Sequence, residues 1–136
     1  MSKEYIGEPT HEGRFIELIS VNAPNETADY RENKPSVLYT GATHSRELVT
    51  IKMILAVMLK LLHGVHYEDT ESIKMLETTQ VYLMPAVNPD GVAYIESNEI
   101  GDGEIVLKRK NMNPAIDCRD PVDNGVDLNR NFDVSW

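Results

Sequence analysis

The apolar run that begins at Glu47 constrains the fold more than any other feature of this sequence. Residues 47–64 read ELVTIKMILAVMLKLLHG, and Lys52 and Lys60 are the only charges after the first residue. The run contains no proline and its single glycine, Gly64, stands last, so it predicts one long helix that ends at a glycine C-cap. Because apolar side chains fall on almost every face, we expect this helix to be buried on most sides.

Short runs of strand-forming residues on both sides of this helix predict a sheet. The predicted strands are 15–21 (FIELISV), 36–41 (SVLYTG) and 79–87 (TQVYLMPAV). Between the long helix and the last strand, DTESIKML (69–76) predicts a brief amphipathic helix that begins at Asp69 or Thr70. This order of elements predicts an α/β fold with a mostly inner sheet.

The remainder of the chain is expected to be irregular. NPDG (88–91) is strong turn chemistry directly after the last predicted strand, and IGDGE (100–104) and NPAIDCRDPVDNG (113–125) also predict loops. No internal repeat is visible, and no apolar run approaches the roughly 18 residues that a membrane span requires. One compact domain is the expectation for 136 residues.

Charge and cysteine content narrow the possible functions. The formal net charge is −9 with a sequence pI near 4.8, which argues against a nucleic-acid-binding surface built from clustered Lys and Arg. Cys118 is the only cysteine, so an intrachain disulfide is impossible. The first residues, MSKEYIGEPTHEGRF, contain no apolar signal-peptide core, and a cytoplasmic location is the default expectation.

GATHSRELVT (41–50) carries the first candidate chemistry. It places His44 and Glu47 three residues apart where a strand gives way to the long helix. An imidazole nitrogen and a carboxylate oxygen both bind zinc at about 2.0 to 2.2 Å, so the pair can share one ion. A catalytic zinc normally has three protein ligands. The alternative is that Glu47 caps the helix N-terminus and His44 is a loop histidine.

Further motifs appear in order along the chain. EGR (12–14), HSRE (44–47), NPDG (88–91), KRKN (108–111) and GVDLNRNF (125–132) together resemble the zinc metallocarboxypeptidases of the carboxypeptidase A family. The resemblance runs over nearly the whole chain. It implies a mixed sheet packed on helices, similar to the first half of the zinc carboxypeptidase (phosphorylase/hydrolase-like) fold. Residues 1–136 would then form a single partial peptidase domain that lacks the family's opening helix and C-terminal half.

The resemblance also implies a zinc centre. His44 and Glu47 match the family's first two zinc ligands. Asp127 of GVDLNR matches the carboxylate that orients the ligating histidine, a partner that such histidines usually have. The bland alternative for Asp127 is a turn-forming residue.

Four other positions match residues that handle the substrate. Arg109 of KRKN resembles the arginine that polarises the scissile carbonyl and stabilises the oxyanion. Asn129 and Arg130 are similar to the pair that grips the free C-terminal carboxylate, for which a guanidinium fork is suited. Arg46 matches a subsite arginine. The implied reaction is hydrolysis of the C-terminal peptide bond of a peptide or protein. The alternatives are a surface arginine for Arg46 and an ion-paired Arg130.

Three elements of the family's site have no counterpart in this sequence. They are the third zinc ligand (a histidine), the general base (a glutamate) and a mobile tyrosine. His63 and His66 are poor substitutes, because some 16 helical residues, or about 24 Å, separate them from Glu47. We therefore expect no independent catalysis from these 136 residues.

Two further possibilities remain at this point. The chain is a non-catalytic relative retained for protein interaction, or one part of an enzyme whose remaining half comes from a partner chain. A calcium loop that starts at Asp120 is a competing metal hypothesis, although Val122 and Asn131 would fall where oxygen donors and a bidentate glutamate are needed.

Overall fold

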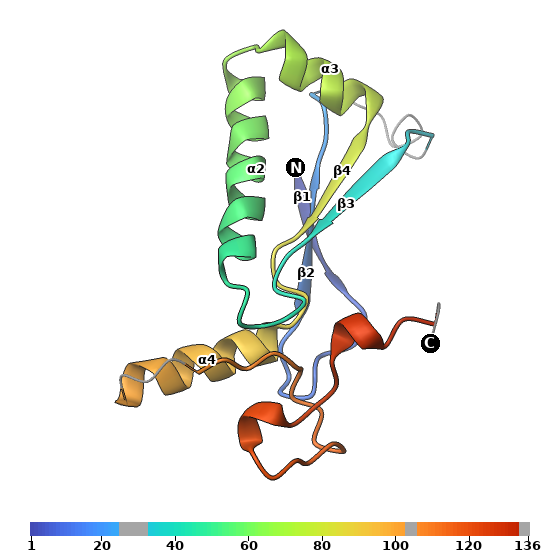
Figure 1. Ribbon diagram of the computed structural model, residues 1–136. Coiled ribbons are helices and arrows are strands. Elements are labelled where there is room, and N and C mark those ends of the chain that lie inside the picture. The colour runs from blue at the N-terminus through green and yellow to red at the C-terminus, as the bar shows by residue number, and fades with distance from the viewer. Residues whose placement is uncertain (25–32, 103–105, 134–136) are drawn as a thin grey trace.

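The structure is a computed structural model that describes residues 1–24, 33–102 and 106–133. It contains one sheet of four strands in the order β1-β2-β4-β3 (Figure 1). The strands are β1 (Ser2–Ile6), β2 (Ile16–Val21), β3 (Ser36–Thr40) and β4 (Gln80–Met84). β1 pairs antiparallel with β2, and β2 pairs antiparallel with β4, whereas β3 and β4 are parallel. The expected α/β class with a mixed sheet is confirmed.

The register of the sheet decides which side chains meet the helices. Ile19 lies opposite Leu83, and Val21 lies opposite Val81, so these four side chains share one face of the sheet. Helix α2 (Val49–His66) covers this face (Figure 1). Its length and apolar content suit a helix that crosses from the end of β3 back along the sheet.

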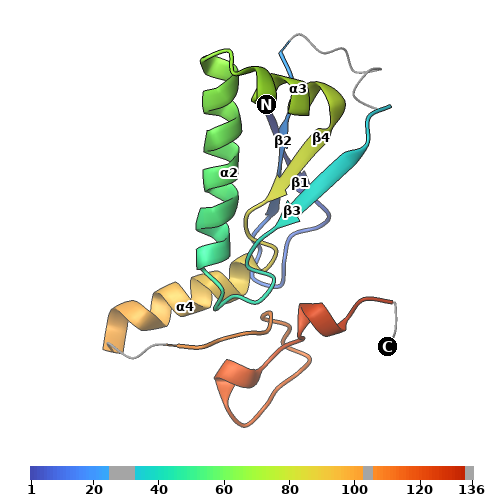
Figure 2. The same ribbon diagram turned by 45° about the horizontal axis from the view of Figure 1, so that its top comes forward.

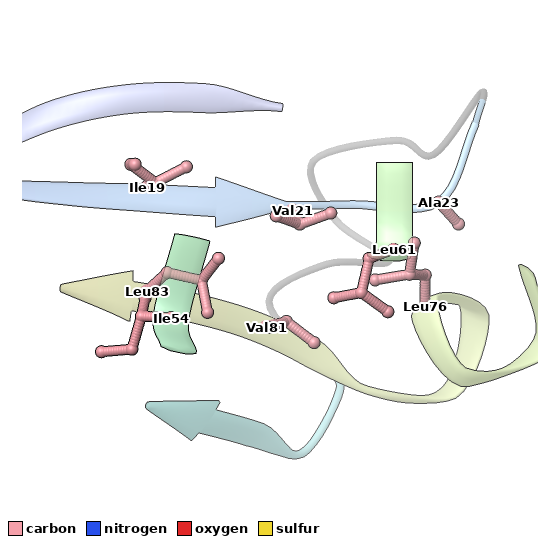
Figure 3. Packing of buried hydrophobic residues seen from close by; sticks show 8 residues of the cluster. All are labelled: Ile19, Val21, Ala23, Ile54, Leu61, Leu76, Val81 and Leu83. Carbon is pink, nitrogen blue, oxygen red and sulfur yellow. The ribbon is translucent and has the colours of Figure 1, made fainter. Parts of the chain in front are cut away.

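The buried core fills the space between the sheet and two helices (Figure 3). α3 (Thr70–Thr78) follows α2 and begins at Asp69, whose carboxylate accepts a hydrogen bond from the Ser72 backbone N–H at 2.9 Å. The core residues come from β2 and the residues just after it, and from α2, α3 and β4: Ile19, Val21, Ala23, Ile54, Leu61, Leu76, Val81 and Leu83. The helices α2 and α3 and the strands β2, β3 and β4 lie where the sequence predicted them.

α2 departs from the sequence prediction in two ways. Gly64 is not the C-cap, because the helix continues to His66 and Tyr67 takes the cap position. Gly64 is instead buried where α2 meets α3, and a Cβ there would lie 2.5 Å from the Ser72 Cβ. The glycine thus permits a close approach of the two helices rather than a helix end.

α2 is also less covered than expected. Val49, Met53 and Leu59 are each more than 60% exposed, although Ile54 and Leu61 are buried. The prediction that this helix is buried on most sides is wrong for the described residues, in which its main contacts are with the sheet and α3. α2 has the length and mean hydropathy of a membrane span, 1.5 over 18 residues, contrary to the sequence expectation. The core helix of a soluble protein meets the same criteria.

Two elements were missed by the sequence prediction. β1 is an exposed edge strand without the apolar alternation of a half-buried strand, and it is held by pairing with β2. α4 (Pro89–Asp102) replaces the expected loop over 100–102, while 103–104 of that loop lie outside the described residues. NPDG is a helix start, because the Asn88 side-chain oxygen accepts a hydrogen bond from the Gly91 N–H at 3.0 Å.

After α4 the chain is mostly irregular, as predicted. Two single turns of 3-10 helix interrupt it, η1 (Pro121–Asp123) and η2 (Leu128–Arg130). This segment lies beyond the end of the sheet at which β3 leads into α2 (Figure 2). It thereby brings residues of KRKN and GVDLNR to the loop that carries His44.

Candidate metal centre

The loop that carries His44 leaves the sheet at the carboxyl end of β3. The Gly41 N–H donates to the Met84 carbonyl at 2.9 Å, which extends the parallel pairing by one residue. A Cβ on Gly41 would lie 2.6 Å from the Pro85 carbonyl oxygen, so only glycine fits there. Ala42 follows with a φ of 44°, an uncommon conformation for a residue with a side chain. The chain thus turns sharply between β3 and α2 and places His44 at the sheet edge.

His44 and Glu47 face each other across this turn. The His44 Nδ1 lies 2.8 Å from the Glu47 Oε1, and the Glu47 N–H donates to the His44 carbonyl at 3.0 Å. The imidazole side chain is 9% exposed and the carboxylate 45% exposed. The imidazole is therefore buried, and the carboxylate faces solvent. Leu48 is the N-cap of α2, and the Glu47 carboxylate contacts His44 instead of a backbone N–H of the helix.

The other ring nitrogen of His44 faces a carboxylate. His44 Nε2 lies 3.3 Å from Asp127 Oδ1, although this buried nitrogen lacks a well-aligned hydrogen-bond partner among the described residues. Ligating histidines usually direct one nitrogen to the metal and the other to a carboxylate or carbonyl. The His44 ring has this arrangement, with Nδ1 on the ligand side and Nε2 toward Asp127.

The two donors suit zinc chemically, and the distance between them requires a small adjustment. Two ligand atoms at about 2.0 to 2.1 Å from a tetrahedral ion lie about 3.4 Å apart. The 2.8 Å between His44 Nδ1 and Glu47 Oε1 is shorter, as expected for a direct contact of the two side chains. The exposed carboxylate can rotate outward by this amount. The residues therefore fit as two ligands of a zinc ion.

A third ligand is not found in the part of the chain that the structure describes. No group of three or more His, Cys, Asp or Glu side chains converges there in a metal-binding arrangement. His63 and His66 lie in the last turn of α2, at the opposite end of that helix from Glu47, and contact Tyr67 through their rings. This placement agrees with the prediction that they do not share an ion with Glu47.

Asp127 joins the metal-ligand pair to Arg109. Its Oδ2 accepts a hydrogen bond from Arg109 Nε at 2.8 Å, and its Oδ1 accepts one from the Asn129 N–H at 3.0 Å. The hydrogen bond from Arg109 is the main reason that the pKa of Asp127 lies below its usual value. Asp127 is therefore an anion that holds the Arg109 guanidinium and lies beside the His44 ring. It also caps η2, as the turn-forming alternative expected.

The other predicted substrate residues lie on the surface. Arg46, Asn129 and Arg130 are exposed, and none is joined to His44 or Glu47 by a hydrogen bond or ion pair. Arg130 donates through Nη1 to the Asn129 carbonyl at 3.0 Å and forms no ion pair with a described residue. Its guanidinium therefore remains available for an anion.

The acidic loop does not hold a calcium ion in the way that Asp120 suggested. The carbonyls of Pro121, Val122 and Asn124 face the Lys108 ammonium, at 3.5, 3.3 and 2.7 Å from Nζ. Lys108 is fully buried, and this burial lowers its pKa. A lysine thus occupies the position among these oxygens that a cation would need. The Asp120 carboxylate is used by the Val122 N–H at 2.9 Å.

Sequence reasoning missed several buried polar residues behind the site. Ser45, Asn88, Asp90 and Lys108 are each 2% exposed or less. All four lie in motifs that the sequence analysis singled out, but NPDG was interpreted as a turn, and Ser45 and Lys108 were given no role within HSRE and KRKN. Ser45 and Lys108 donate to backbone carbonyls, and no spacing rule in a sequence predicts such bonds.

Taken together, the fold and the facing His44, Glu47 and Asp127 side chains define an α/β protein with a buried histidine between two carboxylates at the end of the sheet. The family model described as "Zinc carboxypeptidase" matches residues 1–136, and the chain belongs to this family. Relatives that the chain matches carry the names zinc carboxypeptidase, metallocarboxypeptidase A and carboxypeptidase B.

Individual relatives match nearly the whole chain. The chain is 31% identical over 128 residues to a zinc carboxypeptidase of Saccharothrix mutabilis subsp. capreolus, and the match covers 93% of this chain and 26% of that protein. A carboxypeptidase B of Helicoverpa zea is 34% identical over 126 residues, with 92% and 26% covered. The chain therefore spans about a quarter of the length of these relatives.

Solved structures agree in fold. A carboxypeptidase A from Helicoverpa armigera superposes with a TM-score of 0.66 at 26% identity, covering 99% of this chain and 29% of that one. Thrombin activatable fibrinolysis inhibitor superposes with a TM-score of 0.71 at 22% identity, with 97% and 29% covered, which supports the fold alone. The predicted resemblance to the carboxypeptidase fold is confirmed.

Proposed function

We propose that this chain contributes the first two zinc ligands and part of the substrate site of a metallocarboxypeptidase that hydrolyses the C-terminal peptide bond of peptides or proteins. The observation that carries the proposal is the His44 ring, which has Glu47 beside one nitrogen and Asp127 beside the other. Membership of the zinc carboxypeptidase family supports the same chemistry.

In this proposal the side chains have distinct tasks. His44 and Glu47 would hold the ion, which when bound would supply Lewis-acid polarisation of the scissile carbonyl. With the ion bound, Asp127 would accept the His44 proton from Nε2, so that Nδ1 presents its lone pair on the ligand side. The same carboxylate holds Arg109, whose remaining guanidinium N–H groups are free to stabilise negative charge on the carbonyl oxygen.

Recognition of a chain end is assigned to the surface pair on η2. Asn129 and Arg130 would bind the free α-carboxylate of the substrate, the amide as a donor and the guanidinium as a two-pronged donor. Arg46 would contact the substrate further from its end. This arrangement makes the activity an exopeptidase activity, because an internal peptide bond offers no carboxylate at that position.

A third zinc ligand and a general base are not identified among the described residues. We assign both to other polypeptide, either a further part of the same domain or a partner chain. The 136-residue chain alone is therefore expected to bind zinc weakly and to hydrolyse no peptide. A partial peptidase domain is consistent with the fraction of its relatives that the chain spans.

A second candidate function is a non-catalytic carboxypeptidase-like chain that acts in protein interaction. A hollow of about 560 Å³ supports it, and Ile16, Leu38 and Met84 line this hollow. These side chains lie on the sheet face opposite α2, where Leu38 is 51% exposed. A protein called inactive metallocarboxypeptidase ECM14, from Arthroderma benhamiae, is 30% identical over 129 residues, covering 93% of this chain and 20% of that protein.

Peptide binding tests the carboxylate assignment without requiring turnover. A blocked dipeptide with a free C-terminus and its C-terminal amide are titrated into the zinc-loaded 136-residue chain and followed by NMR. We expect binding of the free acid only, weakened about tenfold by Arg130→Ala, the cost of one charge-assisted hydrogen bond. Arg119→Ala, which removes another exposed arginine, is the matched control and should bind normally.

Three outcomes would count against the proposal. Equal binding of acid and amide would remove the exopeptidase assignment of Asn129 and Arg130. Release of an amino acid by the chain alone would show that the ligand set and the base are complete without further polypeptide. Stoichiometric zinc without binding of either peptide would favour the non-catalytic function.

A further inference from the structure

Buried polar side chains are concentrated behind the metal ligands. Eight polar or charged residues are buried in the described part of the chain, and five of them lie in this one region: His44, Ser45, Asn88, Asp90 and Lys108. A buried polar group lowers stability unless it is hydrogen-bonded. Such a concentration therefore indicates a hydrogen-bonded network with a definite geometry, rather than packing alone.

Ser45 ties the ligand loop to the segment that carries Arg109. Ser45, which stands between His44 and Arg46 in the sequence, is fully buried. Its N–H donates to the Arg109 carbonyl at 3.2 Å, and its Oγ donates to the Lys108 carbonyl at 2.8 Å. One residue thus holds two consecutive peptide groups of a segment that is far away in the sequence.

Asn88 makes a second tie to the same segment. Its Nδ2 donates to the Lys110 carbonyl at 3.1 Å, while its backbone N–H donates to the Ala42 carbonyl at 3.1 Å. Its Oδ1 accepts from the Gly91 N–H and caps α4. Asn88 therefore touches three elements at once: the ligand loop, α4 and the segment that carries Arg109.

Ser45 and Asn88 are packed against each other through Gly91. A Cβ on Gly91 would lie 2.6 Å from Ser45 Oγ and 2.7 Å from Asn88 Nδ2. Both distances are shorter than side-chain contacts allow, so only glycine lets α4 approach the two donors. The positions of the serine and the asparagine are consequently fixed relative to each other.

The segment held by these two residues leads on to Asp127. The Asn111 N–H donates to the Val126 carbonyl at 3.0 Å, and the Asn111 side-chain oxygen accepts from the Val126 N–H at 2.8 Å. Gly125, with a φ of 91°, lies so close to Asn111 that a Cβ would overlap its backbone. The network therefore runs from the ligand loop through residues 108–111 to Asp127 and returns to His44.

The first turn of α4 is itself anchored. Asp90, 2% exposed, accepts hydrogen bonds from the Thr10 hydroxyl at 2.7 Å and the Glu12 N–H at 3.2 Å. Arg14 reaches the same carboxylate at 3.1 Å. The turn between β1 and β2 thus fixes the helix start that carries Asn88 and Gly91.

From this geometry we propose that Ser45 and Asn88 are positioning residues of the metal centre, which set where Asp127 lies relative to the His44 ring. The inference rests on the proposed function only in taking His44 and Glu47 as zinc ligands. Neither side chain touches the ligand side of the site. Both act by holding peptide groups of residues 108–111, and hence the carboxylate that selects the ring nitrogen carrying the proton.

The test uses variants that remove one donor each. Ser45→Ala loses the bond to the Lys108 carbonyl, and Asn88→Ser loses the amide donor while a serine still caps α4. Ser97→Ala is the matched control, because Ser97 Oγ also donates to a backbone carbonyl, Ala93, at 2.8 Å on the exposed side of α4. All are made in the 136-residue chain.

Two measurements separate positioning from a structural contribution. The ring ¹⁵N shifts of His44 report which nitrogen carries the proton, and zinc titration reports affinity. In the zinc-loaded chain, where the ion replaces the direct contact between His44 Nδ1 and Glu47, we expect the wild-type chain and Ser97→Ala to keep the proton on Nε2. Ser45→Ala and Asn88→Ser are expected to show a mixture of both ring forms and about fivefold weaker zinc binding, the factor that corresponds to about 1 kcal/mol for one hydrogen bond.

The outcomes distinguish this inference from the proposed function. If both variants retain the wild-type ring form and zinc affinity, and lose only thermal stability, the residues are structural and the inference is overturned. If the wild-type chain binds no zinc through His44, the ligand assignment fails instead. In that case a difference in the His44 ring ¹⁵N shifts between the wild-type chain and the two variants still decides whether Ser45 and Asn88 position Asp127.

Discussion

Replacing Asp127 with asparagine tests how the site is held together. The substitution keeps the shape of the side chain and removes its charge. Asp127 accepts from Arg109 Nε at 2.8 Å through one oxygen and lies 3.3 Å from His44 Nε2 through the other. An amide can accept through its oxygen alone, so Asp127→Asn cannot satisfy both donors, and it no longer stabilises a positive partner on either side.

The expected size of the effect follows from these contacts. Partners that orient a ligating histidine typically contribute tenfold to hundredfold in metal affinity. Because Asp127 is 18% exposed and the His44 contact is long, we expect the lower end, about tenfold. The charge-assisted bond from Arg109 is also lost, so the guanidinium should become more mobile.

The assay is zinc affinity by competition with a chromophoric chelator, together with the Nε–H resonance of Arg109. Asp123→Asn, at an exposed carboxylate in η1, is the control for the loss of one negative charge. If Asp127→Asn binds zinc as tightly as the wild-type chain, the carboxylate does not orient a ligand. Equal losses in both variants would indicate long-range electrostatics instead.

Of three further predictions, one concerns Lys108 behind the site and two concern the junction of α2 and α3, at the other end of α2. Gly64→Ala should destabilise the chain by about 1 to 3 kcal/mol in urea unfolding, because the new Cβ meets the Ser72 Cβ at 2.5 Å, and Ser72→Gly in the same chain should restore most of the loss. Lys108→Met should leave the Val122 and Asn124 carbonyls without the lysine donor and speed hydrogen exchange at the Cys118 amide, and unchanged exchange would show that the lysine does not order this loop. Hydrogen bonds from the Ser72 side chain and backbone lower the pKa of Asp69, so this cap is fully effective above pH of about 3.9 and is lost as the pH falls through the lowered pKa. Asp69→Asn keeps a cap that does not titrate, and its urea midpoint should therefore fall less between pH 5 and pH 2 than that of the wild-type chain.

The sequence was most informative where structure depends on local patterns. Strand-forming runs placed β2, β3 and β4, and the apolar run placed α2 within two residues at its start. α4 was missed because PDGVAYIESNEIGD contains a proline, two glycines and no clear amphipathic period. Its stability comes instead from the Asn88 cap and from the full burial of Ile95, and neither is visible as periodicity.

The same distinction between local and long-range patterns applies to the site residues. The spacing of His44 and Glu47 alone suggested a shared ion, because the two residues are only three positions apart in the sequence. Asp127 and Arg109 approach them only through the fold, so they were assigned by resemblance to a family. Ser45 and Asn88 remained unassigned, since their partners are backbone carbonyls whose positions depend on the course of the whole segment 108–111.

Zinc titration of the 136-residue chain, with variants of its histidines, tests the central claim most directly. We predict one ion per chain, bound more weakly than at a site with three protein ligands, and loss of this binding in His44→Ala and Glu47→Ala. His63→Ala and His66→Ala, at the other end of α2, should bind as the wild-type chain does. Zinc binding that survives His44→Ala, or that disappears with the helix-end histidines, would contradict the assignment of His44 and Glu47 as the metal ligands.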